Sequence, residues 1–110
     1  MLYYEFNTGS AEYKLRLSTR ATVALEKQLG CNPLMIFGAD GGRIPTVTEM
    51  VQILHSSLQQ YNHNIGMTEA YDIFDEWLAD NHTVTDFLSV IVEVYKVSGI
   101  MKSEKVNEKN

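Results

Sequence analysis

The sequence predicts a mainly α-helical α+β domain in which about four helices pack with a small N-terminal β-hairpin. Three observations carry this prediction: a densely apolar stretch near residue 90 with helical spacing, two earlier stretches with helix-capping signals, and two short strand-like runs before residue 18, of which the second alternates in polarity. A chain of 110 residues that is 45% hydrophobic has the size and apolar content of one domain. We expect residues 1–101 to form it and residues 102–110 to be a flexible polar tail.

The stretch from Val84 to Val97 is the densest apolar run, and we infer that the rest of the chain is built around it. Nine of its fourteen residues are apolar and six of these are β-branched, which on composition favours a strand. The polar residues decide for a helix, because they recur at i, i+3, i+7 and i+10: Asp86, Ser89, Glu93 and Lys96. Thr83 with Asp86 is typical of a helix start, and Gly99 of a helix end.

Earlier in the chain, Leu2 to Phe6 and Glu12 to Leu17 predict the two strands of the hairpin, since apolar and charged residues alternate in the second run. Ser18 or Thr19 can cap a helix that ends at Gly30. Residues 34–37 are expected to form a short helical turn that plugs the core.

Two more helices are predicted before the apolar stretch. The first runs from Thr46 to about residue 62, with Thr46 and Glu49 as a capping box and with Val47, Val51 and the following residues as its apolar side: Met50, Leu54, Leu58 and Tyr61. The second runs from a cap at Thr68 to about residue 81. The apolar faces of the four predicted helices together predict a shared core of six residues: Leu25, Leu54, Leu58, Phe74, Trp77 and Ile91.

Charge and composition restrict the function. The net charge of −5 argues against nucleic acid as a partner, because phosphate binding needs a basic face. No apolar run approaches the ~20 residues of a membrane span, and the N-terminus does not resemble a signal peptide. The single cysteine, Cys31, fits a reducing cytosol.

The side chains that could carry chemistry are scattered. Candidate metal ligands lie in four separate segments without ligand spacing: Cys31, His55, His63 and His82. The acidic cluster of Asp72, Asp75 and Glu76 is read as a solvated helix face in preference to a cation site. The glycine-rich loop at residues 38–42 lacks the lysine of a phosphate-binding loop. We therefore expect no catalytic residue, no cofactor site and no metal site, and predict that the protein is not an enzyme.

The order of several sequence blocks resembles a known family. The blocks are LEKQLGCNPL at residues 25–34, IPTVTEMVQILHSSLQ at residues 44–59, and YDIFDEWL at residues 71–78. From about residue 13 to residue 100 the chain is similar to the tail assembly chaperones of long-tailed bacteriophages, including prophages of Gram-positive bacteria. The resemblance supplies no catalytic residues to carry over.

The resemblance implies a function that composition alone does not. Proteins of this family are encoded beside the tape measure protein, a long helical protein that sets tail length, and hold it while tail tube subunits polymerise around it. It implies the tape measure protein and possibly the tail tube protein as partners, location in the cytoplasm of the bacterial host, and absence from the mature virion. In many relatives a programmed frameshift yields a longer second product.

A partner surface is expected on one flank of the apolar helix. Val90, Val94 and Val97, joined by Met101 if the helix continues, are spaced i, i+4, i+7 and i+11, which is typical of a contact seam. If exposed, this flank would mediate self-association or bind the tape measure protein. The alternative is that the hairpin or residues 34–37 cover it.

Two other function classes remain. One is a small structural or head–tail completion protein that stays in the virion. The other is an enzyme accessory subunit or a small metal-dependent enzyme, which the scattered ligands disfavour.

Overall fold

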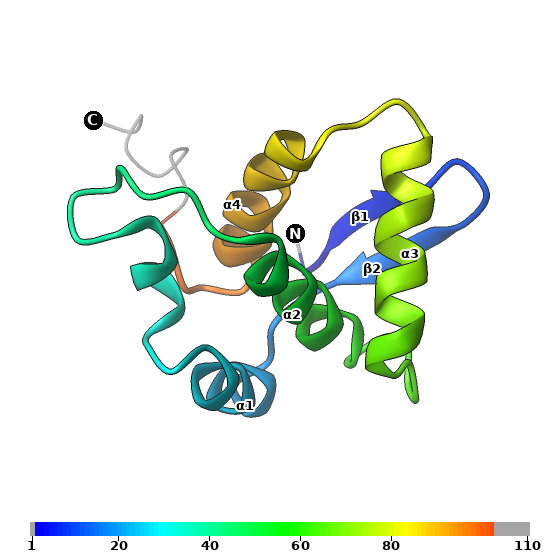
Figure 1. The fold of residues 1–110 in the computed structure, drawn as a ribbon. Coiled ribbons are helices and arrows are strands. Elements are labelled where there is room, and N and C mark those ends of the chain that lie inside the picture. Colours follow the sequence, from blue (N-terminus) through cyan, green and yellow to red (C-terminus); the bar gives the residue numbers. More distant parts are fainter. Residues whose placement is uncertain (1, 103–110) are drawn as a thin grey trace, which may run out of the picture.

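The computed structural model describes residues 2–102, which form a β-hairpin and four α-helices (Figure 1), so the predicted α+β class is confirmed. In chain order the elements are strands β1 (Tyr4–Asn7) and β2 (Glu12–Leu15), helix α1 (Thr19–Leu29), the 3₁₀ helix η1 (Pro33–Phe37), helices α2 (Val47–Leu58) and α3 (Met67–Ala79), the 3₁₀ helix η2 (Val84–Asp86) and helix α4 (Phe87–Val97). Of the predicted tail, 102–110, all but Lys102 lies outside the described residues.

The hairpin is antiparallel and slightly shorter than the sequence predicts. Tyr4 pairs with Leu15, and Asn7 pairs with Glu12 beside the turn. The turn requires Gly9 for two reasons: its φ is +93°, and a Cβ at this position would lie 2.9 Å from the Asp80 carboxyl carbon. The turn therefore also fixes how closely the hairpin approaches the end of α3.

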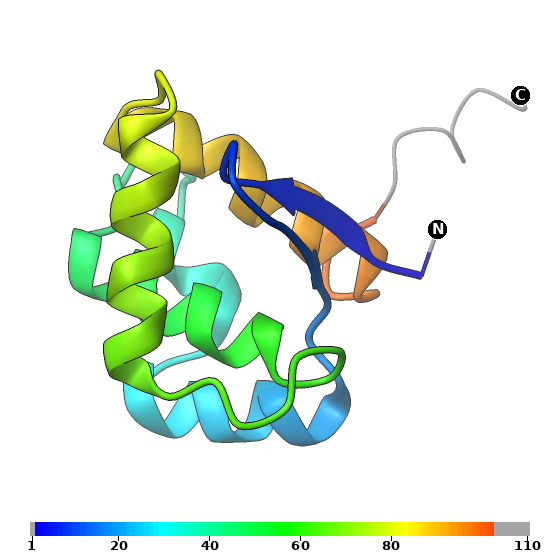
Figure 2. The ribbon, with the colours of Figure 1, turned by 90° about the vertical axis from the view of Figure 1, so that its right-hand side faces the viewer.

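Helix α2, and not α4, is the element on which the others converge. It contacts α1, α3, α4 and β2, and it lies between α1 at the bottom and α4 at the top in both Figure 1 and Figure 2. Buried residues surround most of its circumference: Met50, Val51, Ile53, Leu54, Ser56, Ser57 and Leu58. The expectation that residues 84–97 organise the fold is thus corrected, because α4 has an exposed polar face while α2 is covered by neighbours on several sides.

The segment that follows β2 ties α2 to the end of α4. The backbone N–H of Arg16 donates to the Ser57 carbonyl at 2.9 Å, and the Arg16 guanidinium donates to the Val97 carbonyl at 2.6 Å. The backbone N–H of Leu17 donates to the Ser98 hydroxyl at 2.9 Å. With β1 against α4 and β2 against α2, the hairpin is held between the two helices. A lone two-stranded hairpin is marginal in water, so this placement accounts for its stability.

The six residues predicted to share a core do so, and each is at most 4% exposed. An aromatic cluster forms its centre, where the Trp77 ring lies 5.4–5.9 Å from the rings of Phe6, Phe74 and Phe87. His82 covers the cluster from outside, stacked on Trp77 at 4.3 Å, with its Nδ1–H donating to the Trp77 carbonyl. His82 is thereby assigned a structural role.

Most predicted helix ends are confirmed by local hydrogen bonds. The Ser18 hydroxyl accepts from the backbone of α1, Gly30 adopts the left-handed conformation that ends it, and Thr46 with Glu49 forms a complete capping box at the start of α2. The predicted cap at Thr68 is wrong. The cap is Gly66, two residues earlier, and helix α3 begins at Met67, because the Glu69 carboxylate in the first turn accepts from the Gly66 N–H at 2.7 Å.

Two apolar residues assigned to the core side of α2 lie at the surface instead. Val47 occupies the exposed first turn. Tyr61 follows the helix and packs edge-on against Tyr3, 5.4 Å between ring centroids, with the Lys14 ammonium over both rings. Helix α2 ends at Leu58, earlier than predicted, so Tyr61 no longer follows the helical spacing that the prediction assumed.

Truncating the aromatic cluster tests this core. Phe74→Ala or Trp77→Ala should lower the free energy of unfolding by about 3–5 kcal/mol, because each leaves a large cavity. Tyr71→Ala on the same helix is the matched control, since Tyr71 is 53% exposed and its loss should change stability by no more than ~0.5 kcal/mol. Urea denaturation followed by circular dichroism measures both. Equal losses at positions 71 and 74 would show that α3 faces the wrong way.

Candidate functional site

The predicted partner flank of α4 is largely inside the protein. Val90 is 4% and Val94 is 1% exposed, because α4 packs against β1 and α2 on this side. The expectation of an exposed seam is therefore corrected for these two residues, and the alternative that the fold covers the flank holds for them. The i, i+4 spacing was real, but it marks the core face of the helix.

The remaining two seam residues, Val97 and Met101, are partly buried. Helix α4 ends at Val97, and Gly99 has a φ of +80°, so Met101 does not continue the helix. The N–H groups of Ile100 and Met101 both donate to the Tyr95 carbonyl, which folds this segment back onto the helix end. Met101 packs against the core, and no extended seam forms.

Exposed apolar side chains gather instead in the connection between α1 and α2. Eight large apolar side chains among the described residues are more than a third exposed, and four of them fall within residues 34–47, at 39–64% exposure: Leu34, Met35, Ile44 and Val47. We call these four residues the connector set. Residues 34–37 plug the core only in part, because a single 3₁₀ turn can direct few of its side chains inward and Ile36 takes the buried position.

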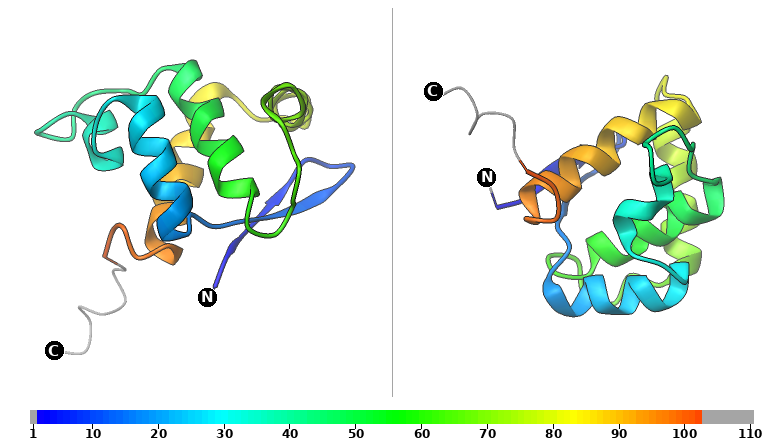
Figure 3. Two further views of the ribbon diagram at one scale, coloured as in Figure 1. Left: turned by 90° about the horizontal axis from the view of Figure 1, so that it is seen from below. Right: turned by 90° about the vertical axis from the view of Figure 1, so that its left-hand side faces the viewer.

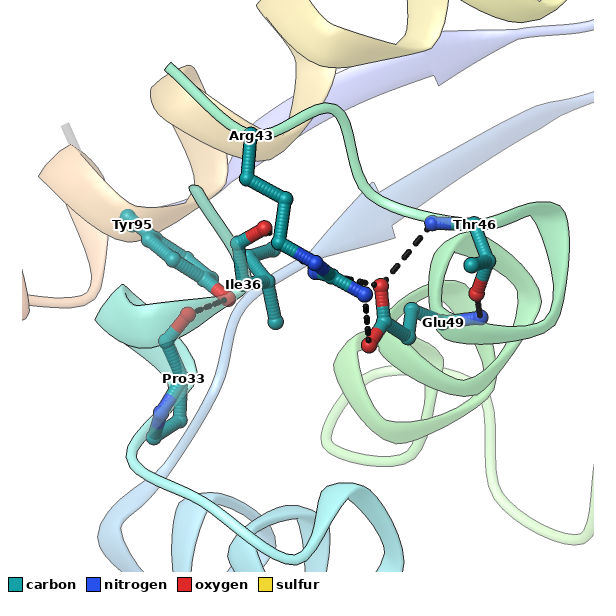
Figure 4. A network of polar contacts seen from close by, with 6 residues as sticks. All are labelled: Pro33, Ile36, Arg43, Thr46, Glu49 and Tyr95. Atoms are coloured by element: carbon teal, nitrogen blue, oxygen red, sulfur yellow. Dashed lines mark hydrogen bonds and ion pairs between the residues drawn. The ribbon is translucent and has the colours of Figure 1, made fainter. Parts of the chain in front are cut away.

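A network of polar contacts fastens the connector to the rest of the fold (Figure 4). The buried Tyr95 hydroxyl donates to the Pro33 carbonyl at 3.0 Å, which joins η1 to α4. Arg43 donates to the Ile36 carbonyl at 2.6 Å and forms a two-pronged ion pair with Glu49 at 3.0 and 3.1 Å. The glycine-rich loop is thus closed on itself and stapled to the start of α2.

The ionisation of this network follows from its geometry. Burial by itself would raise the pKa of Glu49, but the hydrogen bonds from Arg43 and from Thr46 outweigh it and hold the pKa below its ordinary value. The hydrogen bond that Arg43 donates to Glu49 raises the pKa of Arg43, so the pair stays charged at neutral pH. Burial raises the pKa of Tyr95, which therefore remains a neutral hydrogen-bond donor. Glu49, Arg43 and Tyr95 therefore keep the same ionisation states near pH 7, and the contacts that hold the connector stay in place.

A second surface feature is a groove of about 540 Å³ between α1 and α2. The two helices lie side by side (Figure 3, left), and the small side chains of Ala21, Ala24 and Ser56 leave space between their outer faces. Arg20 and His55 contribute polar edges, and Nδ1 of His55 is covered by protein and has no hydrogen-bond partner within residues 2–102. We call this feature the α1–α2 groove.

The candidate metal ligands do not converge. His55 and His63 line the α1–α2 groove, while His82 stacks on Trp77 and Cys31 follows α1. Across the part of the chain that the structure describes, no three His, Cys, Asp or Glu side chains are arranged to hold a metal ion. Of the acidic cluster on α3, Glu76 accepts hydrogen bonds from the hairpin turn. Within residues 2–102 no helix combines the length and apolarity needed to cross a membrane.

Sequence reasoning missed the connector set and the groove for different reasons. Four consecutive apolar residues in a segment too short to be amphipathic were the available signal for the connector, since such a segment cannot bury all of them. No signal existed for the groove, because it depends on which helices are neighbours.

Burial of the former seam gives a direct test. Val94→Ala removes two buried methyl groups and should lower the free energy of unfolding by about 2 kcal/mol, at ~0.8 kcal/mol for each group plus a cavity term. Val23→Ala is the matched control, because Val23 is 47% exposed on α1 and should change stability by less than ~0.5 kcal/mol. Both are read from urea titrations. If Val94→Ala leaves the free energy of unfolding almost unchanged, Val94 is exposed and this assignment is wrong.

The Arg43–Glu49 pair predicts a pH dependence of stability. The folded-state pKa of Glu49 is depressed, so its contribution is fully present above the ordinary glutamate pKa of about 4.3 and is lost as pH falls through the folded-state value. The wild-type advantage over Glu49→Gln should therefore shrink between pH 6 and strongly acidic pH (about pH 3) in thermal melts. Glu26→Gln, an exposed position on α1, should show no such convergence. A pH-independent difference between wild type and Glu49→Gln would refute the assignment.

Comparison with known proteins places the chain in a family. No curated protein and no solved structure matches it. One family does match, over residues 5–110, which is nearly the whole chain and includes every element from β1 to α4. The chain belongs to the family of unknown function DUF6096.

Proposed function

We propose that the protein is a non-catalytic bacteriophage tail assembly chaperone that binds the tape measure protein and assists tail tube polymerisation. The ordered sequence blocks at residues 25–34, 44–59 and 71–78 support the proposal through their similarity to such chaperones. The partners are the tape measure protein and possibly the tail tube protein. The site of action is the cytoplasm of the bacterial host, and the protein is absent from the mature virion.

The structural observation that supports the proposal is the connector set. A protein that holds long amphipathic helices needs apolar side chains that are exposed before binding, into which helical anchors at i, i+3, i+4 and i+7 can pack. Leu34, Met35 and Ile44 are such side chains, and methionine adapts to anchors of different shape. This surface replaces the α4 flank as the proposed contact with the tape measure protein.

The network around Arg43 makes the connector suitable for this role. The carbonyls of Pro33 and Ile36 accept hydrogen bonds, and the Arg43 side chain is paired with Glu49 of α2, so these contacts hold the loop that carries the apolar side chains (Figure 4). Binding to a preordered surface avoids the entropy loss of ordering a mobile loop. Because these contacts hold the connector, its four apolar side chains remain outside the core.

Binding to the tape measure protein is tested by paired variants. Leu34→Ser with Ile44→Ser should weaken capture of the co-expressed tape measure protein about tenfold or more, since each removes an apolar anchor. Leu2→Ser with Val23→Ser is the matched control, because these side chains are equally exposed but lie outside the connector. Circular dichroism establishes that both doubles are folded. Equal capture by all three proteins would place the contact elsewhere, and no capture by the wild type would overturn the proposal.

Virion composition separates the proposal from a small structural or head–tail completion protein. Mass spectrometry of purified particles should detect the tail tube and tape measure proteins but not this chain. Its presence at stoichiometric amounts would favour the structural alternative.

A further inference from the structure

The α1–α2 groove has a charge character opposite to that of the whole chain. The chain has 14 acidic against 9 basic residues, yet none of the described residues that line the groove is acidic. Among the described lining residues, Arg20 carries a formal charge. The groove is therefore an apolar hollow whose charged edge favours an anionic occupant.

Arg20 is also the arginine whose side chain has no partner among the residues that the structure describes. Arg16 donates to backbone carbonyls, and Arg43 is paired with Glu49. Within residues 2–102, the Arg20 guanidinium makes no hydrogen bond or ion pair. Arginine is suited to two-pronged recognition of a carboxylate, so an unpaired guanidinium at the rim of a hollow is a point of attachment.

The outer face of α3 has the complementary composition. Tyr71 is 53% exposed, and Asp72 and Asp75 follow it on the same exposed side of the helix. Neither aspartate makes a hydrogen bond or ion pair with any described residue, whereas Glu69 and Glu76 on the same helix are both engaged. This face offers an aromatic side chain beside two carboxylates that have no partner among residues 2–102, and exposed tyrosine is a frequent anchor at protein interfaces.

We propose that the outer face of α3 of one copy docks into the α1–α2 groove of a second copy. Tyr71 enters the hollow over Ala21 and Ala24, and Asp72 or Asp75 pairs with Arg20 of the neighbouring copy. A groove of about 540 Å³ has room for a tyrosine side chain. This self-association is independent of the proposed contact with the tape measure protein, because it uses none of the connector set.

The fold requires this contact to be made between two copies. Helices α1 and α3 pack against different sides of α2 (Figures 1 and 3), so the groove and the α3 face of one molecule cannot meet each other. The contact joins two different surfaces, so two copies can make it twice in a reciprocal two-fold dimer, and further copies can extend it into a ring or a chain.

Sedimentation velocity over a range of concentrations tests the proposal. The wild type should gain mass with concentration, and added salt should weaken this gain because the paired charges are near the surface. Ala24→Trp, which fills the groove from an exposed position, and Tyr71→Ala, which removes the anchor, should each stay monomeric. Val23→Ala, exposed on α1 but outside the groove, should behave as the wild type.

Mixing the two defective variants gives the decisive result. Ala24→Trp keeps an intact α3 face and Tyr71→Ala keeps an intact groove, so an equimolar mixture should form a one-to-one dimer and no larger species. Arg20→Glu takes the place of Ala24→Trp if circular dichroism shows the latter to be unfolded. A wild type that stays monomeric, variants that associate as the wild type does, or a mixture that stays monomeric would each overturn the proposal.

Discussion

The structure depends on the burial of α2 by elements that are too small to be stable alone. A two-stranded hairpin and short helices each lack the buried area to persist in water. They persist here because α1, α3, α4 and β2 all pack on the same central helix. The buried Ser57 makes this arrangement possible, since its hydroxyl donates to the Leu54 carbonyl while its own carbonyl accepts from Arg16. A polar residue thus joins the helix to the hairpin without an unsatisfied group in the core.

A core centred on α2 leaves apolar side chains exposed in the connection between α1 and α2. The stretch from α1 to α2 cannot fold inward, since only Pro33 and Ile36 of η1 are buried. Instead, the side chains of Arg43 and Tyr95 hold it in place through hydrogen bonds to the Ile36 and Pro33 carbonyls. The helices that pack on α2 do not cover each other's outer faces. The exposed apolar residues of the connector and the groove beside α1 both follow from this. The two surfaces use separate residues, so one copy could hold a partner while it contacts another copy.

The α4 flank shows where periodicity stops being informative. The spacing of Val90 and Val94 identified an apolar edge correctly, but a core edge and a binding edge have the same spacing. Which one it is depends on whether a neighbour covers it, and here β1 and α2 do. The connector set was missed for another reason. Leu34 and Met35 were placed in the core because they are apolar, but of residues 34–37 the short 3₁₀ turn fully buries only Ile36.

The sequence by itself determined the features that depend on nearest neighbours along the chain. The hairpin, the caps at Ser18 and Thr46 and the ends at Gly30 and Gly99 follow from local hydrogen bonds and from backbone conformations that the residue types favour. The composition of the core followed as well, because wide apolar faces must be buried somewhere. Only the tertiary structure decided that α2 is central, that the Val90 and Val94 part of the α4 flank is covered, and that a groove lies between the outer faces of α1 and α2. These depend on contacts between residues distant in sequence, which no local pattern encodes.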